Sequence, residues 1–167
     1  MGGLGDIGMV LDFTKQDADR TAIEFVLPHE LTHQAHAVRR ADPDSGTVLD
    51  RIVSEGLACY AAYIFSAGRQ TPAQSVGYTD EEWARGLAHE TELAAAASPY
   101  LGSKLRRDAD RFAPGTSGCS TPARLRPATS WGFDIMQRYV EKRGSASWVE
   151  AIDLPVREVL SRSGYSL

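Results

Sequence analysis

Apolar residues recur every three or four positions along two stretches of the chain, and this spacing predicts two long helices. The first covers about residues 20–39, and its apolar face is formed by Ile23, Leu27, Leu31, Ala35 and Val38. Pro28 interrupts it, and because proline has no backbone N–H, we expect the helix to kink or restart there. The second helix covers about residues 48–67 and ends at Gly68. The turn at 41–46 is short enough to make the two helices antiparallel.

The remaining pattern predicts a mainly α (α+β) fold. Residues 8–13 are the best strand candidate, as a short N-terminal strand or small edge sheet. A capping box, Thr79 to Glu82, starts a helix that continues to about Ala97. Further elements are expected in order along the chain: a helix at 100–112, a loop at 113–127 rich in Gly, Ser, Thr and Pro, a helix at 129–143, a short helix from Ser145 or Ser147, and a last helix capped by Asp153-Leu154-Pro155.

Candidate chemistry lies on the first helix, in His29-Glu30-Leu31-Thr32-His33. Histidines four apart on a helix leave the same face one turn apart, so both imidazoles can reach one Zn²⁺ at roughly 2.0–2.1 Å. Glu30 stands about 100° around the axis from His29, where a general base for a zinc-bound water belongs. The same five-residue pattern also arises in ordinary exposed helices. A zinc site therefore needs a third protein ligand.

Three acids follow closely enough in sequence to supply that ligand. Asp42 and Asp44 lie in the turn at 41–46, where we expect them to bond the local backbone. Glu55 instead lies in the middle of the second apolar helix. A carboxylate on an apolar face is costly unless it is paired or bound to a metal. A buried salt bridge is the alternative explanation for Glu55.

The two motifs together resemble a known family of enzymes. His29-Glu30-x-x-His33, with 21 residues between His33 and Glu55 of Ser54-Glu55-Gly56-Leu57-Ala58, is similar to gluzincin-type zinc metallopeptidases. It resembles more narrowly the small predicted zinc-dependent protease families in which H-E-x-x-H precedes E-G-L-A. The resemblance covers roughly residues 22–65. It implies a zincin-like helical domain, Zn²⁺ as cofactor, His29, His33 and Glu55 as metal ligands, and Glu30 as the catalytic residue.

Two positions depart from that family pattern. Gluzincins often carry an acid four residues after the ligand glutamate, where it orients a ligating histidine, and here that position is Cys59. A Gly-Tyr pair is common in the late helix of these families, and here Gly132-Phe133 stands in its place. If that tyrosine polarises the substrate in relatives, this chain lacks it at Phe133.

Other histidines and tyrosines offer further candidates. Viewed down the helix axis, His36 points in nearly the same direction as His29 and His33. It lies about 10.5 Å along the axis from His29, however, which is too far for both to bind one ion comfortably. We expect it to lie at the rim or behind the ligands, or to be a surface histidine. His89-Glu90 is expected to be a surface pair. A donor for a developing oxyanion is sought among Tyr60, Tyr63, Tyr78 and His89.

Composition and charge bear on the number of domains, the partners and the compartment, and they leave the predicted zinc site unchanged. The chain of 167 residues is 43% hydrophobic and 24% charged, as expected for one globular domain, residues 1–167. The chain begins 28 residues before His29, and a fragment of a longer protein is one of the interpretations we consider. A net charge of −4 argues against nucleic acid as the main partner. No signal peptide or membrane span is predicted, so the cytoplasm is the default compartment. A bridge between Cys59 and Cys119 is not expected.

The sequence thus predicts a zinc-dependent peptidase acting on a peptide or protein substrate. The alternative is a catalytically degenerate zinc-binding domain that acts as a protein-interaction module, which the changes at Cys59 and Phe133 would suit. Zinc-dependent hydrolysis of a non-peptide amide is a third possibility. Substrate sequence, oligomeric state and the oxyanion donor are left open.

Overall fold

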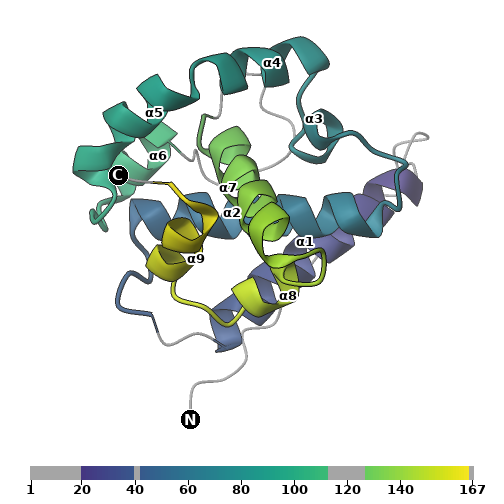
Figure 1. Cartoon of the computed structure of the whole chain (residues 1–167), viewed down its shortest axis with the longest axis horizontal. Coiled ribbons are helices and arrows are strands. Elements are labelled where there is room, and N and C mark those ends of the chain that lie inside the picture. The colour runs from purple at the N-terminus through teal and green to yellow at the C-terminus, as the bar shows by residue number, and fades with distance from the viewer. Residues whose placement is uncertain (1–19, 40–41, 113–126, 166–167) are drawn as a thin grey trace.

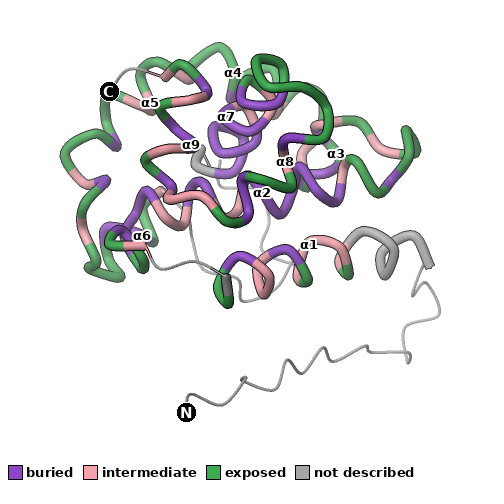
Figure 2. Tube along the Cα trace, turned by 60° about the horizontal axis from the view of Figure 1, so that its bottom comes forward, coloured by how far each residue is buried: buried purple, intermediate pink, exposed green. Residues whose placement is uncertain are grey.

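The computed structural model describes residues 20–39, 42–112 and 127–165, and every regular element within these ranges is a helix (Figure 1). Helix α2 (Val48–Phe65) is central, with α1 (Arg20–Arg39) and α7 (Pro127–Arg143) on opposite sides of it (Figure 2). The smaller elements are α3 (Pro72–Ser75), α4 (Asp80–Ala88), α5 (Glu90–Ala97), the 3₁₀ helix η1 (Ser98–Tyr100), α6 (Arg106–Phe112), α8 (Trp148–Ala151) and α9 (Val156–Ser163). The mainly helical fold is confirmed, and the strand predicted at 8–13 lies outside the described residues.

Some predicted boundaries were wrong. The helix expected from Thr79 to Ala97 is divided at His89, whose φ of −106° and ψ of 12° end α4 and lead into α5. The helix expected at 100–112 begins only at Arg106, because the Ser103 hydroxyl donates to Asp108 and accepts from the Leu105 N–H. Pro28 lies inside one helix, α1, so the helix does not restart there. No helix in the described ranges is long and apolar enough to cross a membrane.

Helix α2 forms where capping and burial agree. The Thr47 hydroxyl accepts the Asp50 N–H at 3.2 Å and so caps its first turn. Its buried residues lie on more than one side: Val48, Leu49, Ile52, Val53, Gly56, Leu57, Ala58, Cys59, Tyr60, Ala61 and Ala62. Burying one large aliphatic side chain stabilises a fold by about 1.5–3 kcal/mol. The helix is therefore held from several sides and makes a rigid platform for the residues it carries.

The turn between α1 and α2 is tied to the C-terminal part of the chain. Asp42 accepts the Asp44 N–H at 2.8 Å, the local bond expected from the sequence, and also the Val156 N–H at 2.8 Å. Asp44 accepts two bonds from the Arg157 guanidinium, at 2.6 and 3.0 Å. Charge-assisted bidentate pairs of this kind add geometric specificity. The turn thus joins α9 to the α1–α2 hairpin.

Helices α2 and α7 touch backbone to backbone at two glycines. A Cβ placed on Gly56 would lie 2.1 Å from the carbonyl carbon and oxygen of Gly132. A Cβ placed on Gly132 would lie 2.2 Å from the Ile52 carbonyl oxygen. No side chain fits such a contact, since the atoms it would meet belong to backbone that cannot rotate away. The crossing therefore requires glycine at both positions.

We expect Gly56→Ala and Gly132→Ala each to lower the free energy of unfolding by about 3 kcal/mol or more, because the two helices must separate. Urea unfolding followed by circular dichroism measures this. Gly102→Ala is the matched control, because a Cβ there meets nothing within 4 Å; its effect should stay within about 0.5 kcal/mol. Equal stability of Gly56→Ala and Gly102→Ala would contradict the close crossing.

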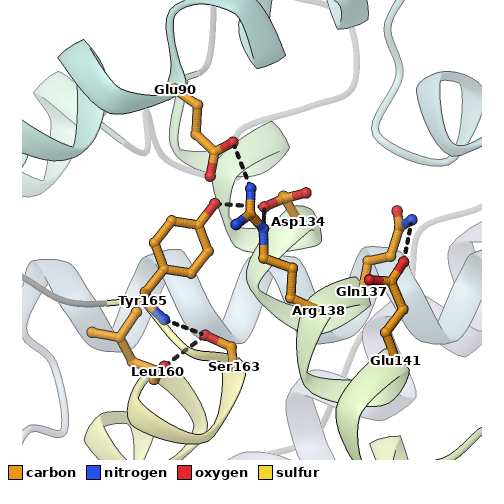
Figure 3. Close-up of polar contacts among 8 residues, drawn as sticks. All are labelled: Glu90, Asp134, Gln137, Arg138, Glu141, Leu160, Ser163 and Tyr165. Atoms are coloured by element: carbon orange, nitrogen blue, oxygen red, sulfur yellow. Dashed lines mark hydrogen bonds and ion pairs between the residues drawn. The ribbon is translucent and has the colours of Figure 1, made fainter.

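A polar cluster lies along the middle of α7, just after Gly132 (Figure 3). Arg138 donates to Asp134 at 2.6 Å and to Glu90 of α5 at 3.4 Å, and its guanidinium lies 4.7 Å from the centre of the Tyr165 ring. The Tyr165 hydroxyl donates to Asp134 at 2.5 Å. Burial and then the charge of Asp134 raise the pKa of Glu90 to about 7, and Arg138 offsets only part of this. The cluster links α5, α7 and the residues after α9.

This raised pKa predicts that stability falls as pH rises. Folded Glu90 keeps its proton up to about pH 7, whereas the unfolded side chain loses it near 4.5, so the favourable contribution is lost between those values. We expect the wild type to lose about 1 kcal/mol of unfolding free energy relative to Glu90→Gln over that range, since solvent reaches part of the cluster. Urea titrations of both proteins at several pH values measure the difference. Parallel pH profiles would contradict it.

Candidate metal site

Helix α1 places two imidazoles side by side, as the sequence predicted. The Nε2 atoms of His29 and His33 lie 3.1 Å apart, and the rings meet edge to face with centroids 4.7 Å apart. Between them on the helix, the Thr32 hydroxyl donates to the Pro28 carbonyl at 2.7 Å. This is the bond that a threonine hydroxyl can make to the carbonyl four residues earlier in a helix, and it adds a bond within the turn that carries both histidines.

Helix α2 brings Glu55 to the same point. One oxygen, Oε2, lies 3.7 Å from His29 Nε2, and the other, Oε1, lies 3.6 Å from His33 Nε2. Within the described part of the chain, these three residues form a group whose ligand atoms all lie within 4.8 Å of one another. Their side chains are 16–23% exposed, so the group is shielded but open to solvent on one side. The return of Glu55 over the histidine pair is confirmed.

The donor set suits zinc. Ligands at roughly 2.0–2.1 Å from a tetrahedral ion lie about 3.3 Å from one another. The two Nε2 atoms, 3.1 Å apart, are close to that value, and the Glu55 carboxylate faces them through its two oxygens, Oε2 at 3.7 Å from His29 and Oε1 at 3.6 Å from His33. Two nitrogens with one carboxylate are a ligand set found in catalytic zinc sites. No fourth His, Cys, Asp or Glu of the described residues belongs to the group. The residues present therefore fit the metal.

Protonation distinguishes the two histidines. Burial, followed by the nearby charge of His33, lowers the pKa of His29. Burial also acts to lower the pKa of His33, but its hydrogen bond to Glu55 and the charge of Glu55 together raise it. Of the two imidazoles, His33 therefore binds a proton more readily than His29. A metal must replace that proton, because only a neutral imidazole can ligate.

Glu30 follows His29 on α1 and is half-buried. Its charge acts to raise the pKa of both His29 and His33, which places the carboxylate close enough to influence both rings. Glu30 is not part of the three-residue ligand group. It is a nearby carboxylate without a place among the ligands, as a general base would be.

Cys59 stands at the position where the resemblance to gluzincins led us to expect an acid that orients a histidine. Its Sγ lies 3.7 Å from Nδ1 of His29, the ring nitrogen that faces away from the ligand group. The contact is within reach of a weak hydrogen bond to sulfur, so position 59 still borders His29 although the carboxylate is absent. Cys59 is buried, and Cys119 lies outside the described residues.

His36 is a buried residue of the α1–α2 interface, so of the locations considered for it, the protein surface was wrong. Only 3% of it is exposed, and its Nδ1 lies 3.0 Å from the Ser54 hydroxyl, which in turn donates to Asp50 at 3.3 Å. It does not join the ligand group. The sequence analysis missed Ser54 and Asp50 as neighbours of the site. The sequence does contain one indication of them, because Asp50 and Ser54 are polar residues four positions apart in a mostly apolar helix.

The tyrosine candidates are associated with the core. Phe133 is fully buried, and its ring lies 5.5 Å from Tyr60, 5.8 Å from Tyr63 and 5.4 Å from Trp83. Tyr78 is partly buried and packs against the same core. His89 is exposed, as expected, and pairs with Glu92 at 3.0 Å, whereas only 13% of the Glu90 side chain is exposed, so its expected surface location was wrong. The place of the family tyrosine is therefore filled by an apolar ring inside an aromatic cluster.

Comparison with known proteins agrees with the donor set. No curated protein and no solved structure matches the chain. A family model described as "Predicted Zn-dependent protease (DUF2268)" matches residues 1–161. That match spans both helices of the candidate metal site and nearly the whole chain. The chain belongs to this family of predicted zinc-dependent proteases.

Proposed function

We propose that the chain is a zinc-dependent peptidase of the gluzincin type, in which His29, His33 and Glu55 bind the metal and Glu30 is the general base. One observation supports this most directly: two imidazole nitrogens and a carboxylate from separate helices converge to within 4.8 Å. A structural site would have no use for the additional carboxylate of Glu30 beside the ligands. The family to which the chain belongs is itself described as a predicted protease.

The proposed mechanism divides the work among few groups. Zinc, when bound, polarises the scissile carbonyl and lowers the pKa of a water at the site to about 7. Glu30 accepts the proton of that water as it attacks the carbonyl carbon, and then delivers the proton to the leaving amine. Cys59, at 3.7 Å from His29 Nδ1, borders the ring and restricts its rotation. The half-buried setting strengthens each of these electrostatic interactions compared with water.

Glu30→Gln should retain zinc and lose hydrolysis by about 10²–10⁴-fold, because the amide has the shape of the acid but cannot accept the proton. Cleavage of a fluorogenic peptide library measures the rate, and elemental analysis measures the metal. Glu81→Gln, at an exposed position of α4, is the matched control and should keep full activity. Full activity of Glu30→Gln would remove Glu30 from the mechanism. A protein that binds zinc but cleaves nothing even with Glu30 intact would favour the interaction module.

Glu55→Ala should reduce bound zinc from about one ion per chain to a small fraction, since two ligands from one helix hold zinc poorly. Metal content after dialysis against a weak chelator measures this, with Glu81→Gln again as control. The melting temperature in excess zinc should rise for the wild type and not for Glu55→Ala, because only the intact site binds the metal in the folded state. Equal zinc content in both proteins would reject Glu55 as a ligand.

A further inference from the structure

The polar cluster on α7, formed by Glu90, Asp134, Arg138 and Tyr165, sets two carboxylates around one guanidinium (Figure 3). Arg138 donates to Asp134 at 2.6 Å and to Glu90 at 3.4 Å. The Tyr165 hydroxyl also donates to Asp134, at 2.5 Å. Asp134 therefore accepts both short bonds of the cluster, whereas Glu90 accepts one long bond.

Glu90 is the member of this cluster whose charge is poorly balanced. Only 13% of its side chain is exposed, and its Oε1 atom is buried without a hydrogen-bond partner among the described residues. If Glu90 is ionised, the two acids leave one negative charge in excess over Arg138. If it is protonated, it is neutral and can donate to Asp134. Burial, the charge of Asp134 and this hydrogen bond accordingly raise the pKa of Glu90 to about 7.

The groups that act on Glu90 lie on α7. In the described part of the chain, α4 and η1 also pack against α5, but the charged side chains that shift the pKa of Glu90 are Asp134 and Arg138. His89, the preceding residue, is exposed and pairs instead with Glu92 at 3.0 Å. Ionisation of Glu90 therefore acts on the contact between α5 and α7.

Glu90 is also the first residue of α5, at an end that little else holds. The break at His89 separates this end from α4, and within the described residues no side-chain hydrogen bond caps it. The buried residue of α5 is Ala97, at the far end of the helix. The first turn closes with a bond from the Leu93 N–H to the His89 carbonyl, at 3.0 Å. This turn can therefore move away from α7 by a change at His89, with Ala97 still buried.

We propose that Glu90 is a proton-dependent latch, which holds the first turn of α5 against α7 when it is protonated and weakens that hold when it is ionised. In the open form Glu90 is in water, where its pKa returns to the ordinary 4.5. The open form is therefore increasingly populated as pH rises from 4.5 to about 7, and above that range both forms are ionised and the populations stay constant. This device does not depend on the metal or on the proposed peptidase function.

Amide hydrogen exchange at Leu93 in the full chain, followed by NMR, tests the proposal. Protection factors are compared at about pH 5 and about pH 7.5, since a protection factor already corrects for the intrinsic effect of pH on exchange. We expect the protection of Leu93 to decrease about fivefold over this range in the wild type. The decrease should be insensitive to low concentrations of urea, because a local opening exposes little surface. Amides in the middle of α2 should be better protected and should respond to urea.

Three variants assign the effect to Glu90. Glu90→Gln should abolish the decrease, because the amide resembles the protonated acid and cannot ionise. Asp134→Asn keeps an oxygen for Tyr165 and leaves Glu90 paired with Arg138, so the decrease should shrink to about twofold or less. Glu92→Gln is the matched control on the same turn: it removes the partner of His89, whose side-chain type ordinarily changes charge in this pH range, and should keep the wild-type decrease.

Equal protection of Leu93 at both pH values in the wild type would overturn the proposal. The same decrease in Glu90→Gln would also overturn it, and loss of the decrease in Glu92→Gln would assign the effect to His89. If Leu93 showed the urea dependence of the α2 amides, Glu90 would act on global unfolding alone and the latch would be rejected. Asp134→Asn keeps the test decisive if Glu90→Gln folds poorly, since an undiminished decrease in that variant contradicts the charge imbalance.

Discussion

The close contact of Gly56 with Gly132 is the constraint on which the rest of the structure depends. A backbone-to-backbone crossing leaves no side chain that can adjust, so it fixes both the rotation of α2 and its position along its own axis. Glu55 is the residue immediately before Gly56. With Gly56 held against α7, the preceding side chain, about 100° away around the helix, is directed to the face that meets α1. Gly56, the glycine of the second motif, thus fixes the direction in which the Glu55 carboxylate points.

The local parts of this arrangement could be predicted from sequence because they depend on helix geometry alone. The spacing of His29 and His33 places two imidazoles together on any regular helix, and a short turn returns Glu55 to them. The mainly helical class followed from apolar periodicity in the same way. The division at His89 could not be predicted, because the capping box at Thr79 indicates where the helix begins but not where it ends. Asp42 was predicted to bond its own turn, and nothing local indicates its second bond, to the Val156 N–H.

Contacts between distant segments explain the other differences. In the sequence, Gly132-Phe133 was notable because phenylalanine stands where a tyrosine was expected. In the structure, Gly132 forms the close crossing with α2, and the Phe133 ring is fully buried. The location of His36 was left open between the rim, a place behind the ligands and the surface, because the sequence of a single helix does not show which helix packs against it. Only the packing of α2 shows that Ser54 covers it. Side chains on one helix can be placed by periodicity, but burial depends on the partner helix, which periodicity does not identify.

The candidate ligands come from two elements, so metal binding at this site would be coupled to the stability of the fold. Two imidazoles and the Glu55 carboxylate share a half-buried space in which His33 needs either a proton or a metal to balance Glu55. An unfolded chain does not hold α1 and α2 in register, so any ion bound by all three ligands favours the folded state by mass action. The bonds from Asp42 and Asp44 to α9 hold that register from the turn, and the glycine crossing holds it from α7. Contacts that involve none of the candidate ligands therefore fix the relative positions of α1 and α2. The three ligand side chains are brought together by folding, before any ion binds.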